Sequence, residues 1–160
     1  MEEVIRIGMA EFAVSRAPQK ITTLGLGSCV GASIFDPLVK VGGMIHIMLP
    51  YSSMALKSEN PAKFADTGLP LLVERLEQLG ASRSRMFMKI VGGAEMFKID
   101  GPDDRLRIGA RNIEAVESIC QEMSLPIVAR SVGGNTGKSI VLNLEDGSVQ
   151  IRMISGIIVI

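Results

Sequence analysis

Two apolar segments separated by a short turn constrain the fold of this chain more than any other feature. Residues 29–35 and 41–49 are rich in β-branched and small apolar residues. Between them lies Asp36-Pro37-Leu38-Val39, in which Asp and Pro are typical turn residues. The pattern predicts a β-hairpin.

Alternation of residue types predicts the register of this hairpin. Pairing Phe35 with Lys40 across the loop places Cys29 directly opposite His46. One face is then wholly apolar and predicts a core; it carries Val30, Ala32, Ile34, Val41, Ile45, Ile47 and Leu49. The other face carries Cys29 and His46 among the small residues Gly31, Ser33 and Gly42, and we expect it to leave space for a substrate. A slip of one residue would move Cys29 and His46 to opposite faces.

The other segments predict a mixed chain of strands and helices. An amphipathic helix containing Leu69, Leu72, Val73, Leu76 and Leu79 ends at Gly80, with Asp66 or Thr67 as its cap. A second helix follows Asn112 as N-cap, and Cys120 lies on its apolar stripe as a packed core thiol. We expect further strands over 3–7, 11–14, 21–24, 86–91, 127–132, 139–144, 149–154 and 157–160. The fold class is therefore α/β, more closely α+β, with a single domain over residues 1–160.

Composition excludes several classes of function. The 17 basic and 17 acidic side chains balance and do not cluster, which argues against a nucleic-acid partner. No apolar run is long enough to insert into a membrane, so we expect a soluble cytoplasmic protein. The chain has one histidine and two distant cysteines, Cys29 and Cys120, which predict free thiols and no metal site.

Two glycine-rich segments resemble nucleotide-binding motifs but do not match them. Gly133 to Ser139 has three residues where the phosphate-binding loop needs four, and a strand rather than a helix follows. Gly25 to Gly31 places its third glycine one position late for the dinucleotide fingerprint. We expect a glycine turn in the first case and no nucleotide site in either.

The pairing of Cys29 with the only histidine, His46, is the strongest indication of chemistry. A thiol attacks as the thiolate, and an imidazole is the usual group that takes its proton. An activated Cys29 should then be alkylated well below the ordinary thiol pKa of about 8.5. Backbone N–H groups near Gly27 and Ser28 could hold an oxyanion, and Thr23 on the adjoining strand could orient the ring. The alternative reading is a buried thiol beside a structural imidazole.

Several blocks of this sequence resemble the CheD family of chemoreceptor glutamine deamidases. The first run from Thr23 to Val30 and from His46 to Pro50, with Asp36-Pro37 between them. Further blocks follow in the family's order at 63–67, 92–97 and 108–112. One departure lies around Gly133-Gly134, where the family commonly has an acidic residue before the glycines and an arginine after them; this chain has Ser131 and Lys138.

The resemblance implies an enzyme, a protein-glutamine glutaminase. It implies that Cys29 is the nucleophile, His46 the general base and acid, and Thr23 the group that orients His46. The substrates would be glutamines of methyl-accepting chemotaxis receptors, with release of ammonia and no cofactor. The implied fold, shared with certain deamidating toxins, is a layered β-sandwich with flanking helices. The resemblance also implies the CheC phosphatase as a partner, and the alternative function is a regulatory binding module for CheC with little catalytic role.

Overall fold

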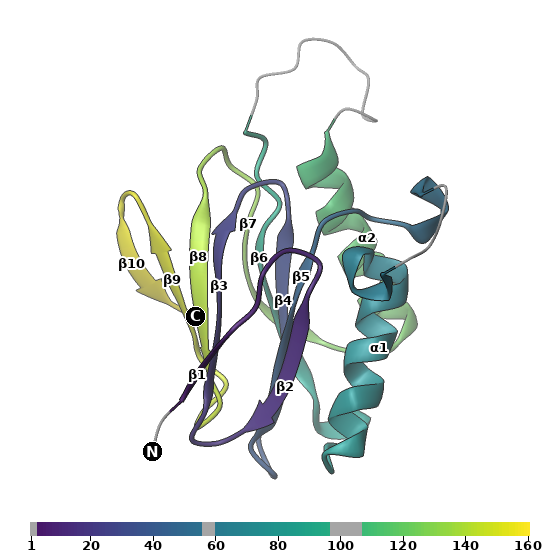
Figure 1. Ribbon diagram of the computed structural model, residues 1–160, viewed down its shortest axis with the longest axis vertical. Helices are drawn as coiled ribbons and strands as arrows, with labels where there is room; N and C mark the ends of the chain where they lie inside the picture. The colour runs from purple at the N-terminus through teal and green to yellow at the C-terminus, as the bar shows by residue number, and fades with distance from the viewer. Residues whose placement is uncertain (1–2, 56–59, 97–106) are drawn as a thin grey trace.

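The computed structural model describes residues 3–55, 60–96 and 107–160, and within them the chain forms three layers. Figure 1 shows one sheet on the left, a second sheet in the centre and two helices on the right. We call the two sheets the outer sheet and the central sheet. Phe97, the last residue of one family block, lies outside the described residues. The layered β-sandwich with flanking helices is confirmed.

The outer sheet has the strand order β1-β3-β8-β9-β10 within the described residues. The neighbouring pairs β3–β8, β8–β9 and β9–β10 are antiparallel, whereas β1 pairs with β3 in parallel. Their bounds are Val4–Arg6 for β1, Lys20–Leu26 for β3, Lys138–Asn143 for β8, Val149–Met153 for β9 and Gly156–Val159 for β10.

The central sheet has the order β2-β5-β4-β6-β7 within the described residues, so the predicted hairpin β4–β5 lies at its middle. The strands β2, β5, β4 and β6 pair antiparallel, whereas β6 and β7 are parallel. Their bounds are Phe12–Arg16 for β2, Val30–Asp36 for β4, Val41–Ile47 for β5, Phe87–Gly92 for β6 and Ile127–Val132 for β7.

Two α-helices, α1 (Ala65–Gln78) and α2 (Ile108–Glu122), cover the central sheet on the face away from the outer sheet. The described residues also include short 3₁₀ turns at Ser52–Met54, Pro61–Lys63 and Arg83–Arg85. Among the described residues no helix combines the length and the apolar character needed to cross a membrane.

The predicted helix starts are wrong. Helix α1 begins directly after Phe64, which makes no side-chain cap, and the Asp66 carboxylate instead accepts hydrogen bonds from the backbone and hydroxyl of Ser52. Helix α2 begins four residues before Asn112, because the Glu95 carboxylate accepts from the backbone N–H of Ala110 at 2.9 Å. A carboxylate from a distant segment thus satisfies the helix N-terminus, and local sequence gives no sign of it.

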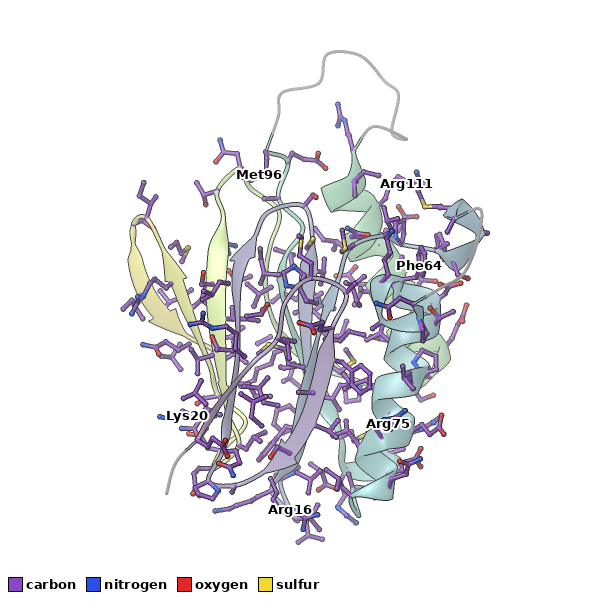
Figure 2. All side chains as sticks on the ribbon, viewed as in Figure 1. Arg16, Lys20, Phe64, Arg75, Met96 and Arg111 are labelled. Atoms are coloured by element: carbon purple, nitrogen blue, oxygen red, sulfur yellow. The ribbon has the colours of Figure 1, made fainter. Side chains whose placement is uncertain are left out.

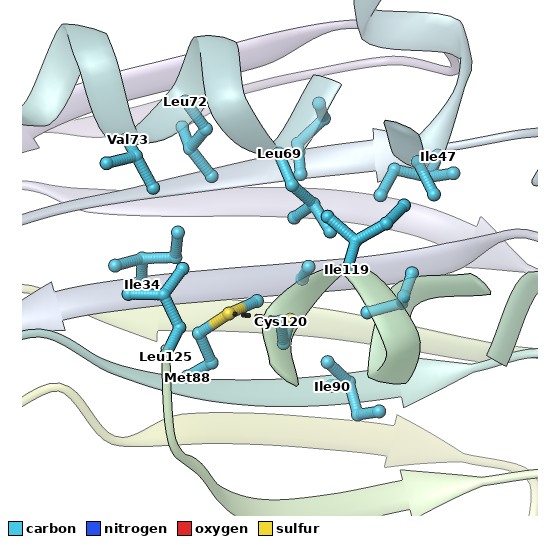
Figure 3. Packing of buried hydrophobic residues seen from close by; sticks show 14 of the residues in the cluster. Ile34, Ile47, Leu69, Leu72, Val73, Met88, Ile90, Ile119, Cys120 and Leu125 are labelled. Atoms are coloured by element: carbon cyan, nitrogen blue, oxygen red, sulfur yellow. Dashed lines mark hydrogen bonds between the residues drawn. The ribbon is translucent and has the colours of Figure 1, made fainter. Parts of the chain in front are cut away.

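Two apolar clusters hold the three layers together. The first lies between the central sheet and the helices, and Figure 3 shows Leu69, Leu72 and Val73 from α1 facing strand residues such as Ile34. The second lies between the two sheets and includes Phe35 and Met44 from the central sheet with Leu26 and Ile140 from the outer sheet. The hairpin β4–β5 is therefore buried on both faces, which explains its almost continuous apolar sequence.

Cys120 lies in the first cluster, as predicted. It is 1% exposed, and its Sγ lies 3.1 Å from the Met88 Sδ atom, the contact drawn in Figure 3. Burial, with a smaller contribution from the Glu117 carboxylate, raises the pKa of the Cys120 thiol to about 12. Cys120 is thus a protonated core residue.

The predicted hairpin register is wrong by two residues. Asp36 pairs with Val41, and Gly31 rather than Cys29 lies opposite His46. Asp36 stays in the strand because its buried carboxylate accepts from the backbone of Leu38, and the loop closes through Lys40 at a φ of 51°. Since the shift is an even number of residues, every side chain keeps its predicted face. The apolar face predicted for Val30 to Ile47 is confirmed in the first cluster.

The expectation of an open face around His46 is also wrong. The outer sheet covers it, and the small residues allow that sheet to approach closely instead of leaving room for a substrate. A Cβ atom on Gly31 would lie 2.8 Å from Ile140 Cδ1, and one on Gly42 would lie 2.6 Å from Leu144 Cδ2. A substrate therefore has to approach from an end of the sandwich.

Candidate active site

Thr23 and His46 come from different sheets and meet between them. Thr23 lies on β3 of the outer sheet, not on a strand adjoining His46 as the sequence suggested, and both side chains are buried. The Thr23 Oγ1 atom lies 2.7 Å from His46 Nδ1 and 2.9 Å from the carbonyl oxygen of Ile7. Stacking of the two sheets thus creates a contact that no hairpin could supply.

The hydrogen bonds of Thr23 define the tautomer of His46. A carbonyl oxygen can only accept, so the single hydroxyl proton of Thr23 goes to Ile7. The same oxygen then accepts from His46 Nδ1–H, which leaves Nε2 of the neutral ring with a free electron pair. His46 Nε2 is buried and has no hydrogen-bond partner among the described residues. The ring is therefore held in the Nδ1–H tautomer, with Nε2 as an unused acceptor.

The backbone of His46 is also hydrogen-bonded, through both its N–H and its carbonyl group. Its N–H donates to the carbonyl of Glu11 at 3.0 Å, and its carbonyl accepts from the N–H of Ala10 at 2.9 Å. Burial lowers the pKa of His46 below the ordinary value of an imidazole. His46 is consequently neutral at neutral pH and ready to accept a proton.

Cys29 lies just before β4, at the end of the sandwich where β3 turns into β4 (Figure 1). Its side chain is half-buried and packs at the margin of the cluster between the two sheets, the same face that holds His46. Because Gly31 is paired with His46, Cys29 lies two residues before that pair, diagonal to His46 and one residue outside β4. The thiol and the imidazole therefore share one face at one end of the sheet.

The electrostatics of this pair do not favour a resting thiolate. Burial raises the pKa of the Cys29 thiol, and a hydrogen bond from its own backbone N–H offsets only part of that effect. Burial also lowers the pKa of His46, and neither change favours a thiolate–imidazolium pair. The resting pair is a neutral thiol and a neutral imidazole, and His46 Nε2 makes no hydrogen bond to Cys29.

The two residues before Cys29, Gly27 and Ser28, are each held by a hydrogen bond to their carbonyl oxygen. The carbonyl of Gly27 accepts from Ala94 N–H at 2.9 Å, and the carbonyl of Ser28 accepts from the Asn112 side chain at 2.9 Å. Both residues named from the sequence as oxyanion donors thus have their carbonyl oxygens engaged. Met96 also packs here, since a Cβ atom on Gly27 would lie 3.2 Å from Met96 Cγ; Figure 2 places Met96 and Arg111 at this end of the molecule.

Gly92 and Gly93 pack against the loop that contains Cys29. The N–H of Gly93 donates to the Cys29 carbonyl at 2.8 Å. Gly92 has a φ of 110°, and a Cβ atom there would lie 2.3 Å from the Cys29 carbonyl oxygen. Glycine is required at this position both by backbone conformation and by space. Sequence reasoning named Asn112 as a helix N-cap, found all three residues within family blocks, and assigned none of them to the site.

Ser131 and Lys138, the two departures from the family pattern, contact each other. The Lys138 Nζ atom donates to the carbonyl and to the hydroxyl of Ser131, each at 3.0 Å. This contact joins β7 of the central sheet to β8 of the outer sheet. The two departures therefore form one local pair and do not touch the Thr23–His46 hydrogen bond.

Comparison with known proteins places the whole chain in one family. The family model described as CheD chemotactic sensory transduction matches residues 48–153. The probable chemoreceptor glutamine deamidase CheD of Lachnoclostridium phytofermentans is 47% identical over 154 residues, which cover 96% of each chain. The chemoreceptor glutamine deamidase CheD of Halalkalibacterium halodurans is 46% identical over 155 residues, again 96% of each. Cys29 and His46 both precede the residues that the family model matches. The alignments with the relatives, however, cover nearly the full length of this chain. The chain therefore belongs to the CheD family.

Proposed function

We propose that this chain hydrolyses glutamine side chains of chemotaxis receptors to glutamate, with Cys29 as nucleophile and His46 as general base and acid. One observation carries the chemistry: the Thr23 hydroxyl holds His46 Nδ1 at 2.7 Å and leaves Nε2 free on the face that Cys29 shares. The names of the relatives, chemoreceptor glutamine deamidases, supply the substrate class.

The first half of the reaction transfers the acyl group to sulfur. The Cys29 proton passes to His46 Nε2 as Sγ bonds to the carboxamide carbon, and the amide oxygen becomes an oxyanion. Backbone N–H groups near Ser28 and Cys29 would stabilise that oxyanion. The imidazolium then gives its proton to the amide nitrogen, the carbon–nitrogen bond breaks, and ammonia leaves a thioester on Cys29.

The second half consumes water. His46 Nε2 takes a proton from a water molecule as the water oxygen attacks the thioester carbon. The tetrahedral species collapses, the carbon–sulfur bond breaks, and the imidazolium returns its proton to Sγ. The net change is glutamine and water to glutamate and ammonia, with Cys29 and His46 restored. The scheme needs no cofactor.

The burial of the site favours a glutamine presented by another protein. The outer sheet packs closely on the small residues of the face that holds His46, so we propose that the carboxamide enters beside the β3–β4 turn, next to Cys29. A glutamine side chain on a receptor helix places its amide at the tip of a narrow, flexible chain. We therefore propose the helices of the receptor's cytoplasmic part as substrate and the cytoplasm as the location of this single domain, residues 1–160.

The experiment is a deamidation assay on a purified receptor fragment. The full chain, Cys29→Ala, His46→Ala and Cys120→Ala are each incubated with the fragment, and ammonia release and conversion of glutamine to glutamate are measured. Cys120→Ala is the matched control, because it removes the other thiol from the core without touching the site. We expect turnover by the wild type and Cys120→Ala and none by Cys29→Ala. Turnover by Cys29→Ala would overturn the mechanism.

The same assay separates the alternative functions. A regulatory module that binds CheC with little catalytic role predicts no turnover by the wild type and intact binding of purified CheC. An amidase for free glutamine predicts ammonia release when free glutamine replaces the receptor. We propose CheC as a partner on the family resemblance, and binding of purified CheC by the wild type and by Cys29→Ala tests it separately from catalysis.

A further inference from the structure

Asn112 links the two segments that carry the proposed catalytic pair. It lies on α2, is fully buried, and donates through Nδ2 to the carbonyl of Ser28 at 2.9 Å and to the carbonyl of Met48 at 3.0 Å. Ser28 directly precedes Cys29, and Met48 follows His46 by two residues. Both partners are carbonyl oxygens, so the amide orientation of Asn112 is defined, with its NH₂ group toward them.

Strand pairing does not reach the nucleophile. The β4–β5 ladder begins at Val30, paired with Ile47, so Cys29 lies one residue beyond it. The peptide on each side of Cys29 is instead fixed by a single hydrogen bond. Asn112 holds the carbonyl of the Ser28–Cys29 peptide, and Gly93 N–H holds the carbonyl of the Cys29–Val30 peptide at 2.8 Å.

Two fixed peptide planes define the backbone conformation of the residue between them. Because a peptide is planar and trans, its N–H points away from its carbonyl oxygen. Holding Ser28 O toward α2 therefore turns Cys29 N–H away from α2. That N–H belongs to the same residue as the sulfur that attacks in the proposed mechanism. It is thus placed next to the atom that attacks, where an oxyanion would form.

We propose that Asn112 is a positioning residue that aims the Cys29 backbone N–H at the oxyanion of the tetrahedral intermediate. This inference rests on the proposed function, since it concerns the same site. Asn112 acts through the Ser28–Cys29 peptide and does not itself touch the reacting atoms. Its effect should therefore be confined to reactions at Cys29 that develop an oxyanion.

The unused half of the amide supports a positioning role. Asn112 Oδ1 is buried and has no hydrogen-bond partner among the described residues. An unpaired buried acceptor is unfavourable for stability, and it accompanies an NH₂ group that makes two hydrogen bonds to the site. Asn112 therefore contributes more to fixing the backbone beside Cys29 than to the stability of the core.

The test compares two reactions of the same thiol. Alkylation by iodoacetamide displaces iodide at a saturated carbon and forms no oxyanion, whereas deamidation of the receptor fragment does. Asn112→Asp keeps the shape and replaces the donor with an acceptor, and Asn112→Ser is a smaller, neutral change for the case in which the carboxylate prevents folding. Val116→Ala is the matched control, because Val116 is a buried residue one turn further along α2 that belongs to the helix-side core.

We expect kcat for deamidation to fall roughly 10- to 100-fold in the folded Asn112 variants, as for partial loss of an oxyanion donor, with little change in KM. The rate of Cys29 alkylation should stay within about twofold of wild type, and Val116→Ala should lower Tm without lowering kcat. Unchanged kcat in a folded Asn112 variant, or an equal fall in deamidation and alkylation, overturns the inference. Absence of wild-type turnover overturns the proposed function itself, and the inference with it.

Discussion

The Thr23 hydroxyl of the outer sheet and the His46 imidazole of the central sheet are joined by a hydrogen bond of 2.7 Å. Thr23→Val keeps the shape of the side chain and leaves His46 Nδ1–H without its acceptor. An unsatisfied buried donor costs about 1–3 kcal/mol, so kcat should fall about 10- to 100-fold if the ring leaves its orientation. Thr23→Ser should recover most of the activity.

Thr22→Val is the control for this prediction. Thr22 is also buried on β3, and its hydroxyl donates to the carbonyl of Ile140 at 2.8 Å, away from His46. Its loss should lower Tm and leave kcat unchanged. Equal effects of Thr22→Val and Thr23→Val on kcat would show that the contact with His46 has no special role.

The directions of the two pKa shifts predict how Cys29 responds to pH. Because burial raises the pKa of the Cys29 thiol, alkylation in a Cys120→Ala background should be slow at neutral pH and accelerate only in alkaline solution. His46→Ala should barely change this profile, since the neutral ring does not stabilise a thiolate. Rapid alkylation near neutral pH that disappears with His46→Ala would instead show a resting thiolate–imidazolium pair.

Deamidation should respond to pH differently from alkylation. In the proposed mechanism the neutral form of His46 acts as the base, and burial lowers the pKa of His46. The acid limb of kcat/KM should therefore lie below the ordinary histidine pKa of about 6.5, with activity maintained into mildly acidic solution. A profile of kcat/KM against pH measures this limb, and an acid limb above neutrality would contradict the prediction.

Gly92 is the position in the site where a single methyl group should do most damage. With a φ of 110° and a Cβ that would lie 2.3 Å from the Cys29 carbonyl oxygen, Gly92→Ala should cost about 3 kcal/mol or more and displace Cys29. Gly80→Ala is the control, since Gly80 has a φ of 98° with nothing within 4 Å of its Cβ position. It should cost about 1–2 kcal/mol and leave kcat intact. Urea unfolding and the deamidation assay compare them.

The hairpin loop depends on a buried carboxylate. Although burial alone would raise it, hydrogen bonds from Arg85, Ser82 and Leu38 hold the pKa of Asp36 below its ordinary value. Asp36→Ala removes the buried carboxylate of an ion pair in which Arg85, 34% exposed, lies 2.9 Å away. It also leaves the Ser82 and Leu38 N–H groups without their acceptor, so it should cost about 1–3 kcal/mol. Urea unfolding measures this loss.

An exposed ion pair provides the comparison for Asp36. Lys40 and Glu145 lie 3.3 Å apart with about half of each side chain exposed, so Glu145→Gln should change stability by less than about 1 kcal/mol. The contribution of Asp36 is present above the unfolded carboxyl pKa of about 3.9 and is lost as pH falls through its lower folded-state pKa. Equal losses in the two variants would contradict the special role of the buried Asp36 carboxylate.

The sequence by itself determined the elements that depend on local pattern. Turn residues and alternation predicted the β4–β5 hairpin and the face of each side chain, and helical spacing predicted the apolar stripes that contain Leu72 and Cys120. These signals survive an error in register, because an even shift preserves faces. The pairing of Cys29 with His46 on one face was therefore predictable although their exact opposition was wrong.

Only the tertiary structure decided how these elements meet. The Asp36 and Glu95 carboxylates accept hydrogen bonds from the distant residues Ser82 and Ala110, and α2 begins before its predicted position. The stacking of the two sheets closed the face above His46 and brought Thr23 to its ring. Asn112 suits a helix cap by type, yet it is buried where α2 meets the ends of two strands. Such contacts depend on packing between layers, for which local sequence carries no signal.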